Sequence, residues 1–458
     1  MNGTQSWLDA NFAKLVRDHG VPGATVAVRH PGGEIVTAAA GVTSTTTGVE
    51  VDTDTIFQIG SITKLWTSAL VMQLVDDGLL DIDKPIKTYL PEFEVGAADA
   101  TNTVTTRQLL SHTAGFEGDI FTDTGRGDDA VEKYLASIHD IPQLFAPGEV
   151  FSYNNTGFVV LGRLVEVLRG QPFDTVLMER LATPLGLTSV SPSPYEAILR
   201  RAAVGHAPDE DGKQVAVATW ALTRSHAPGG AMLAMTPSDL LGFIGMHAAR
   251  GVAPDGRAIL TPATVAAMQE PQVEVPMLAL MGGYWGLGWE IEDFDGIRAI
   301  GHDGGTIGQI AFCRWIPATG IAVALFTNGG DAVGLYRAVA GHLLKELADV
   351  LLPGGRVPPA EPTRIDPTPY LGHYADTIYD LTVTLDDDGR IWLDRQPKDV
   401  IAELGEKPLH VELVHFAGDS LIAVEASSGV HPIFAFVGRN DADLAKFVHN
   451  GRVIARAA

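Results

Sequence analysis

The sequence predicts an α+β domain followed by a linker and an all-β domain, and three observations support this prediction. Strand-like segments stand at both ends of residues 1–352, and helical patterns with long glycine- and proline-punctuated loops lie between them. Residues 353–369, PGGRVPPAEPTRIDPTP, are proline-rich and lack apolar periodicity, which is typical of a semi-rigid linker. Residues 370–458 contain short strand patterns separated by turn signals, which favours a sandwich or a barrel.

The N-terminal segment predicts one helix and two strands. Residues 1–20 form an amphipathic helical pattern without the basic start and apolar block of a signal peptide, so we expect a cytoplasmic protein. The segments GATVAVRH (23–30) and GEIVTAAAGV (33–42) follow as strands joined by the turn PGG. The next helix is expected from Ser61 to about Asp77.

The remaining elements are predicted from apolar residues at helical spacing and from strand patterns. Helical spacing recurs at GFVVLGRLVEVLRG (157–170), TPSDLLGFIGMHAARG (236–251) and GLYRAVAGHLLKELADVLL (334–352). Strand patterns of the first domain recur at GLGWEIE (286–292), IRAIGHDGG (297–305), QIAFCRWIP (309–317) and IAVALFTN (321–328). Those of the second domain recur at YDLTVTLDDDGRIWLD (379–394), HVELVHFAGDSLIAVEA (410–426) and HPIFAFVG (431–438).

The charge balance disfavours two classes of partner. Lys and Arg together number 32 and Asp and Glu 56, so the formal net charge is −24. Such a surface repels nucleic-acid phosphates and anionic lipid headgroups, so we expect neither nucleic acid nor a membrane as a partner. The sequence contains no apolar run of about 18 residues that would predict a membrane span. Homo-oligomerisation is left open.

The single cysteine limits redox and metal chemistry. Cys313 lies in the apolar run IAFCRWI, so an intrachain disulfide and a cysteine-rich metal site are both excluded. We interpret Cys313 as a buried structural thiol, because no histidine or helix start adjoins it. We expect no metal and no cofactor.

The segment FQIGSITKLW places a serine and a lysine on one face of a helix start. Ser61 and Lys64 are three positions apart. A serine hydroxyl is a poor nucleophile until a base removes its proton, and burial lowers the pKa of a lysine so that its amine can act as that base. The positive end of the helix dipole acts in the same direction. The pattern alone is equally typical of a capping serine with a surface lysine.

A second segment, PGEVFSYNNTGFVVLG, brings a tyrosine and an asparagine to the start of another helix. A tyrosine beside a lysine ammonium ionises more easily, so Tyr153 is a candidate for proton transfer to a leaving group. Asn155 offers a donor and an acceptor, which suit Lys64 and a substrate amide. A turn with an N-cap asparagine is the alternative interpretation.

A third segment, GHDGGTIGQIAF, places His302, Asp303, Gly304 and Gly305 at the end of a strand. Paired glycines let a substrate approach the backbone closely and leave an N–H group free for an oxyanion. A β-bulge is the alternative interpretation.

Ser-x-x-Lys, Tyr-x-Asn and His-x-Gly, in this order, resemble the serine β-lactamase and penicillin-binding-protein superfamily. Within it, the chain is similar to the branch of class C β-lactamases, D-alanyl-D-alanine carboxypeptidases, D-aminopeptidases and β-lactamase-like esterases. QLLSHTAGF, TPLGL, APGGAMLAMTPSDL and WGLGW also agree with that branch. The resemblance spans roughly residues 5–350.

The resemblance implies a fold and a set of roles. Helices would cover both faces of an antiparallel sheet built from both ends of the first domain, with a helical insert between. Ser61 would be acylated, and Lys64 and Tyr153 would share the proton transfers. The backbone N–H groups of Ser61 and Gly305 would form the oxyanion hole. The substrate-binding positions would be Asn155, His302, Asp303 and Gly304.

The third motif departs from the branch. β-Lactamases usually carry Lys-Thr-Gly where this chain has HDG, which argues against a dedicated β-lactamase. If Asp303 points into the site, its carboxylate repels anionic substrates by about 1 kcal/mol or more. If its side chain turns away, that argument lapses.

The function expected from these features is a serine hydrolase of small amides or short peptides, including those with D-residues. A short-chain carboxylesterase or an acyltransferase would use the same residues. A catalytically inactive scaffold protein is the remaining alternative, although Ser61, Lys64 and Tyr153 are all present. By analogy with D-aminopeptidases, the β domain would restrict the cleft, and a role in stability or oligomerisation is its alternative.

Overall fold

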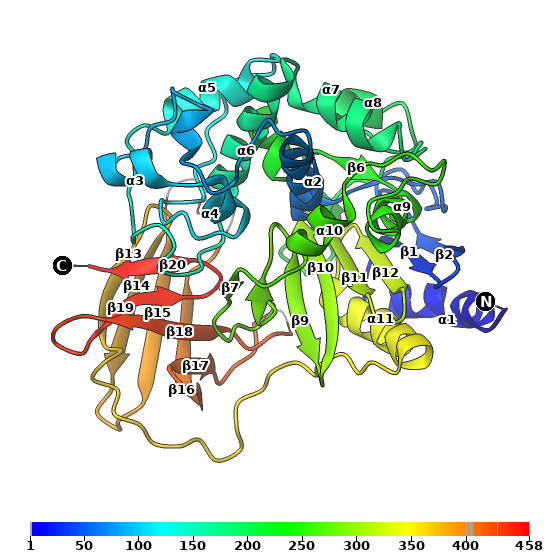
Figure 1. Ribbon diagram of the computed structural model, residues 1–458. Helices are drawn as coiled ribbons and strands as arrows, with labels where there is room; N and C mark the ends of the chain where they lie inside the picture. Colours follow the sequence, from blue (N-terminus) through cyan, green and yellow to red (C-terminus); the bar gives the residue numbers. More distant parts are fainter. Residues whose placement is uncertain (1, 399–401, 403–405, 428, 458) are drawn as a thin grey trace.

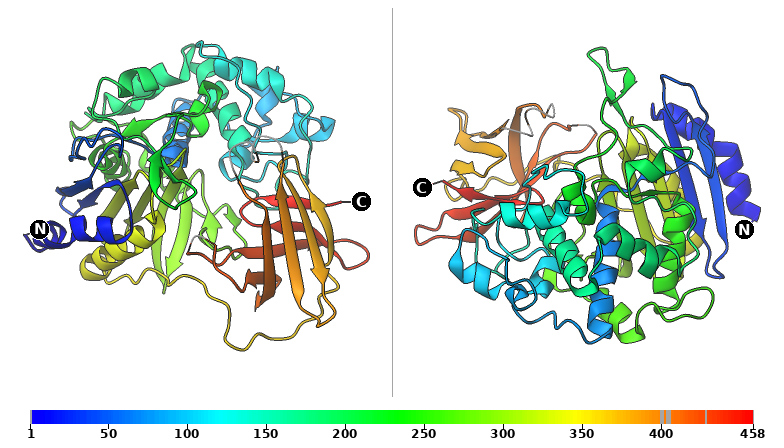
Figure 2. Two further views of the ribbon diagram at one scale, coloured as in Figure 1. Left: turned by 180° about the vertical axis from the view of Figure 1, so that it is seen from behind. Right: turned by 90° about the horizontal axis from the view of Figure 1, so that it is seen from above.

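The computed structural model describes every residue except 1, 399–401, 403–405, 428 and 458. An antiparallel sheet with helices on both faces occupies the first part of the chain, and a closed β-barrel follows it (Figure 1). The barrel and helix α1 (Asn2–Asp18) lie at opposite ends of the molecule in both sets of views (Figures 1 and 2). The predicted fold class is confirmed.

The central sheet has eight strands in the order β2-β1-β12-β11-β10-β9-β8-β7. Ala24 pairs with Thr327, so strands from the two ends of this region are neighbours in the sheet. If β1 and β12 belonged to two separate sheets, each of them would have an unpaired edge. The strands are β1 Gly23–Arg29, β2 Ile35–Gly41, β7 Val273–Glu274, β8 Tyr284–Trp285, β9 Glu290–Phe294, β10 Ile297–Gly305, β11 Ile310–Ile316 and β12 Ile321–Thr327.

Helices cover the two faces of this sheet unequally. Helices α1 and α11 (Ala332–Ala348) pack on one face, with Phe312, Val323 and Leu325 of the sheet in their core. The larger group covers the other face and forms the helical insert (Figure 2). It comprises α2 Thr63–Asp76, α3 Ala98–Thr103, α4 Thr106–Leu110, α5 Ala130–Ser137, α6 Asn155–Arg169, α7 Phe173–Leu177, α8 Pro194–Ala197, α9 Pro237–Ala248 and α10 Pro262–Met268.

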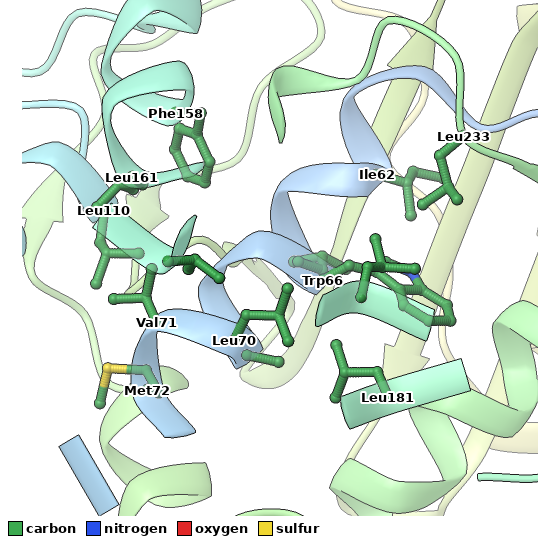
Figure 3. Close-up of a cluster of buried hydrophobic side chains, with 14 of the residues drawn as sticks. Ile62, Trp66, Leu70, Val71, Met72, Leu110, Phe158, Leu161, Leu181 and Leu233 are labelled. Carbon is green, nitrogen blue, oxygen red and sulfur yellow. The ribbon is translucent and has the colours of Figure 1, made fainter. Parts of the chain in front are cut away.

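Helix α2 is the central helix of the larger core. Every residue from Thr63 to Leu74 is buried, so the helix is enclosed on all sides rather than on one face. Trp66 stacks on Phe243 of α9 with ring centroids 4.5 Å apart. Figure 3 shows Trp66 and its neighbours on α2 pointing into side chains from several other segments. The position of α2 is therefore set by contacts around its whole circumference.

The C-terminal barrel has eight antiparallel strands and closes where β13 pairs with β20. Its strands are β13 Gly372–Ala375, β14 Tyr379–Leu385, β15 Ile391–Pro397, β16 Leu409–Ala417, β17 Ser420–Ala423, β18 Ile433–Arg439, β19 Ala445–His449 and β20 Val453–Arg456. Sequence patterns predicted the strands between β14 and β18 but not β13, β19 and β20. The predicted linker falls between the end of α11 and the start of β13, and the domain boundaries stay a prediction.

The hairpin formed by β19 and β20 is bonded to the loop before α6. The carbonyl of Gly451 accepts from the backbone N–H of Tyr153 at 3.0 Å. His449 Nε2 lies 2.8 Å from the carbonyl oxygen of Phe151. The barrel is thus held against a segment that carries one of the sequence motifs.

Among the described helices, none combines the length and apolar character needed to cross a bilayer.

Replacing Trp66 by alanine should remove the centre of the packing around α2. We expect the free energy of unfolding to fall by about 3–5 kcal/mol, because a large buried ring leaves a cavity. The measurement is urea unfolding followed by circular dichroism. The control is Leu199→Ala, since this side chain is 84% exposed and its removal should leave the midpoint almost unchanged. Equal midpoints for the two variants would contradict the central role of α2.

Candidate active site

The three sequence motifs meet at one cavity of about 580 Å³. It lies where the end of β10 approaches the turn before α2 and the loop before α6. Lys64 is fully buried next to Ser61. The other predicted site residues all line the cavity, namely Ser61, Tyr153, Asn155, His302, Asp303, Gly304 and Gly305.

Ser61 sits in a 3₁₀ turn, Gly60–Ile62, that leads into α2. Gly60 has a φ of +52°, which glycine adopts without strain, and a Cβ there would lie 2.6 Å from the backbone nitrogen of Gly305. The predicted helix start is therefore a tighter turn. This turn holds the serine at the wall of the cavity instead of inside the helix.

The Lys64 amine has three close oxygen neighbours from three segments. Its Nζ lies 3.2 Å from Ser61 Oγ, 2.7 Å from Asn155 Oδ1 and 2.6 Å from the carbonyl oxygen of Gly229. A neutral lysine amine has two N–H bonds and one lone pair. Asn155 and Gly229 are acceptors that take the two N–H bonds, so the lone pair is left for the hydroxyl proton of Ser61.

Burial favours the neutral form of the Lys64 amine. Desolvation holds the pKa of Lys64 well below its ordinary value, and the positive charge of Arg452 acts in the same direction. The carboxylate of Asp119 opposes them with a smaller effect. The geometry and the charge state therefore both suit a base directed at Ser61.

Asn155 is fixed at both ends of its amide. Its Oδ1 accepts from Lys64, and its Nδ2 donates to Asp119 Oδ1 at 2.6 Å. Asp119 also pairs with Arg452. The amide of Asn155 is consequently engaged with Lys64 and Asp119, whereas the sequence suggested a substrate amide as its second partner.

Tyr153 differs from the sequence expectation in its ionisation. Its ring lies under the Lys64 Nζ, 4.9 Å from the ring centroid, but burial raises the pKa of the Tyr153 phenol well above its ordinary value. Proximity to a lysine was expected to ease ionisation. Desolvation of the buried phenol outweighs that effect. Tyr153 is thus a protonated hydroxyl in this site.

His302 lies against Tyr153 as a neutral imidazole. Its Nδ1 donates to the carbonyl oxygen of Asp303 at 2.5 Å, which leaves Nε2 as an acceptor 3.5 Å from Tyr153 Oη. Burial lowers the pKa of His302 to about 3. The ring of His112 also packs on Tyr153, at a centroid distance of 4.3 Å, and burial holds the pKa of His112 well below its ordinary value. Two neutral imidazoles therefore hold the phenol in place.

The Asp303 carboxylate is bonded to an arginine. Consecutive side chains of a strand point to opposite faces, so Asp303 and its neighbour His302 diverge. Asp303 accepts from Arg314 Nη1 at 2.6 Å and from Nη2 at 3.1 Å. Arg314, on β11, also contacts Glu290 and Glu292. Asp303 lines the cavity, but its carboxylate is paired with Arg314, and this pairing weakens its repulsion of an anionic substrate.

Glycines allow the backbone of β10 to approach the Ser61 turn. A Cβ at Gly304 would lie 1.9 Å from the carbonyl oxygen of Ile59 and 2.9 Å from the backbone nitrogen of Ser61. A Cβ at Gly230 would lie 2.9 Å from the same nitrogen. This close approach brings the backbone of Ser61 next to that of Gly304 and Gly305, as an oxyanion hole requires.

Two charged residues at this site were missed by sequence reasoning. Asp119 lies in the insert, and Arg452 follows the Asn-Gly pair at 450–451. That pair, between the apolar runs AKFVH and VIAR, is a hairpin signal that could have predicted β19 and β20. It carries no information about what the arginine contacts.

Comparisons with known proteins agree with this geometry. A family model described as Beta-lactamase matches residues 8–345. Penicillin-binding protein 4 of Amycolatopsis lactamdurans is 42% identical over 365 residues, which make up 79% of this chain and 95% of that protein.

Solved structures extend the likeness beyond the family model. The crystal structure of SurE has a TM-score of 0.80 and 30% identity and covers 100% of both chains, and that of SurE with D-Leu has a TM-score of 0.78 and 29% identity over the same coverage. A D-stereospecific amidohydrolase from Streptomyces sp. has a TM-score of 0.56 and 25% identity, covering 73% of this chain and 97% of that one.

Gly304→Ala should separate β10 from the Ser61 turn. The new Cβ would collide with the carbonyl oxygen of Ile59, and a displacement of about 1 Å can reduce a rate about 100-fold. We expect this loss in the acylation of Ser61 by a p-nitrophenyl ester, with an unchanged circular dichroism spectrum. Gly32→Ala is the control, because its Cβ meets no heavy atom within 4 Å. A fully active Gly304→Ala enzyme would refute the close approach.

Proposed function

This chain belongs to the beta-lactamase family, and from that premise we propose that it is a serine hydrolase that cleaves small amides or short peptides through an acyl ester on Ser61. Its family comprises hydrolases, including penicillin-binding proteins and amidases. The amide specificity, the D-preference and the roles of individual residues are the parts that we propose.

One observation carries the proposal. The fully buried Lys64 amine has acceptors for both of its N–H bonds, and its third neighbour is the hydroxyl of Ser61 at 3.2 Å. The alternative interpretation was a capping serine with a surface lysine, and it would leave the Lys64 amine in solvent. An inactive scaffold would have no reason to keep an uncharged lysine in its core beside a serine at a cavity wall.

Acylation then proceeds in two balanced steps. The Lys64 lone pair takes the proton of Ser61 Oγ while Oγ bonds to the substrate carbonyl carbon, and the carbonyl electron pair moves to oxygen. The N–H groups of Ser61 and Gly305 stabilise that oxyanion. As the C–N bond breaks, Tyr153 gives its hydroxyl proton to the leaving nitrogen and regains one from the Lys64 ammonium.

Deacylation repeats this sequence with water as the nucleophile. Lys64 accepts a proton from water, whose oxygen attacks the ester carbon, and the C–Oγ bond then breaks as Lys64 returns the proton to Ser61. An amine in place of water would give acyl transfer with the same groups. A protonated Tyr153 suits the donor role in acylation, and the lowered pKa of Lys64 suits the base role in both half-reactions.

Two of the similar proteins support a D-configured substrate. SurE has been crystallised with D-Leu, and the Streptomyces amidohydrolase is D-stereospecific. The cavity of this chain has apolar residues in its wall, which include Leu222, Ala231 and Trp285. Such walls suit a small aliphatic or aromatic side chain next to the scissile carbonyl.

The proposal is tested with a panel of chromogenic substrates on the wild type and on Ser61→Ala. The panel contains D-alanine and L-alanine p-nitroanilides, a short-chain p-nitrophenyl ester and a chromogenic cephalosporin. We expect the D-anilide to be cleaved at least about 10-fold faster than the L-anilide, which corresponds to about 1.4 kcal/mol. Intact-protein mass spectrometry should find an acyl adduct on the wild type and none on Ser61→Ala.

Other outcomes of the panel have distinct meanings. A dominant ester rate with weak anilide cleavage would favour the carboxylesterase alternative. An adduct or full turnover in Ser61→Ala would overturn the proposed mechanism.

The pH dependence of kcat/KM should report the neutral Lys64. A lysine whose pKa is lowered stays unprotonated, and active, far below pH 10.5, and activity is lost as the pH falls through the lowered pKa. We expect an acid limb of slope one and no loss of activity between neutral pH and 10.5 from this group. Lys64→Ala should lose at least about 100-fold in kcat.

The matched variant is Lys64→Arg, because a guanidinium carries a fixed positive charge and cannot act as a base in this range. It should be as inactive as Lys64→Ala. An active Lys64→Arg enzyme would mean that the lysine acts only through its charge or its packing.

A further inference from the structure

Residues 117–119 of the insert are bonded both to the barrel and to the start of α6. On the barrel side, Glu117 Oε1 accepts from the backbone N–H of Thr377 at 3.0 Å and from its hydroxyl. On the α6 side, the carbonyl oxygen of Gly118 accepts from the backbone N–H of Asn155 at 3.1 Å. The position of the first turn of α6 is therefore coupled to the docking of the barrel.

Asp119 has one partner on each side of this boundary. Its carboxylate forms an ion pair with Arg452 of the barrel, and its Oδ1 accepts from Asn155 Nδ2 at 2.6 Å. The side chain of Asp119 is only 8% exposed, so water offers little replacement for either partner. Arg452 is itself fixed by the turn between β19 and β20, where the backbone N–H of Val453 donates to Ser152 Oγ at 3.2 Å. The barrel thus balances the charge of Asp119 and sets its position.

The carboxylate of Asp119 determines which end of the Asn155 amide faces Lys64. An asparagine amide is an acceptor at its oxygen and a donor at its nitrogen, whereas a carboxylate is an acceptor only. Asp119 therefore takes the nitrogen of the amide and leaves Oδ1 for the Lys64 Nζ, 2.7 Å away. A reversed amide would direct its N–H bonds at the lone pair of Lys64, which could then not accept the proton of Ser61.

We propose that Asp119 is a positioning residue, which acts through Asn155 to keep the lone pair of Lys64 free. The barrel belongs to this arrangement, because its Arg452 holds Asp119 in place. The inference rests on the proposed function, in which Lys64 takes the proton of Ser61. It gives the C-terminal domain a part in acylation itself, beyond the restriction of the cleft that analogy suggests.

A double-mutant cycle tests whether Asp119 acts through Asn155. The variants are Asp119→Ala, Asn155→Ala and the double variant, and the measurement is the rate of Ser61 acylation by a p-nitrophenyl ester. We expect Asp119→Ala to slow acylation about 10- to 100-fold, as for the loss of one hydrogen bond to a charged group. In the Asn155→Ala background the same change should cost less than about 3-fold, because the group that Asp119 positions is absent.

The pH dependence of kcat/KM separates positioning from a loosened site. Beyond the effect of burial, the charge of Arg452 lowers the pKa of Lys64 and that of Asp119 raises it. The imidazoles and the phenol beside the amine are uncharged, as described above. The acid limb should therefore move to lower pH in Asp119→Asn and to higher pH in Arg452→Gln. Entry of water would raise the pKa of Lys64 and move both limbs to higher pH.

Asp128→Asn is the matched control, because it removes an equal charge from the same insert. Asp128 is 72% exposed and pairs with Arg224. This variant should keep the wild-type rate and acid limb, and circular dichroism should match for all variants. If Asp119→Ala loses its native spectrum, Asp119→Asn takes its place in the cycle, since one amide oxygen cannot replace two carboxylate oxygens.

The outcomes distinguish this inference from the proposed function. If the wild type forms an acyl adduct on Ser61 but Asp119→Ala is acylated at the wild-type rate, the inference is wrong and the hydrolase mechanism stands. Equal losses from Asp119→Ala in the wild-type and Asn155→Ala backgrounds, or acid limbs that both move to higher pH, would also overturn it. If the wild type forms no adduct, the proposed function fails and the inference falls with it.

Discussion

The burial of one lysine amine constrains the rest of the hydrolase region. In the unfolded chain Lys64 keeps its proton up to about pH 10.5. In the folded chain, the pKa of Lys64 lies well below that value. Folding must therefore release this proton at any pH between the lowered pKa and 10.5, and this opposes folding. The free-energy cost of burying Lys64 is offset by the packing of a helix that is buried on every side. It is also offset by acceptors for both N–H bonds of the amine. Asn155 at the start of α6 and Gly229 must accordingly meet at the same point as Ser61.

This requirement explains which parts of the architecture were predictable. The range of β10 agrees with the predicted strand at 297–305, and α6 begins within two residues of its prediction, because apolar periodicity and turn residues act locally. The three motifs were also expected to share a site. Each motif is a set of residue types at short spacing, such as Ser61 and Lys64, which a sequence displays directly, whereas the convergence of the motifs was expected from the family resemblance.

Other features depend on contacts that no local pattern encodes. The direction of Asp303 follows from the pleat of β10 and from Arg314 on the next strand. The ionisation of Tyr153 follows from its burial, which a neighbouring lysine in the sequence does not reveal. Arg452 resembles an ordinary charged residue after a turn, and its position at the cavity is a property of how the barrel docks. Sequence reasoning therefore identified residues that line the cavity better than the contacts that surround them.

The strand order of the sheet also has a consequence for the timing of folding during synthesis. Val26 of β1 is bonded in register with Leu325, so β1 lacks its partner on that side until the ribosome has delivered nearly three hundred further residues. The Ser61 turn leaves the ribosome early, but β10 and Gly229, which surround it, arrive much later, and Arg452 later still. A nascent chain thus carries the proposed nucleophile long before the residues that surround it. Contacts of such long sequence separation form slowly, and we expect the reactive centre to be among the last parts of the molecule to assemble.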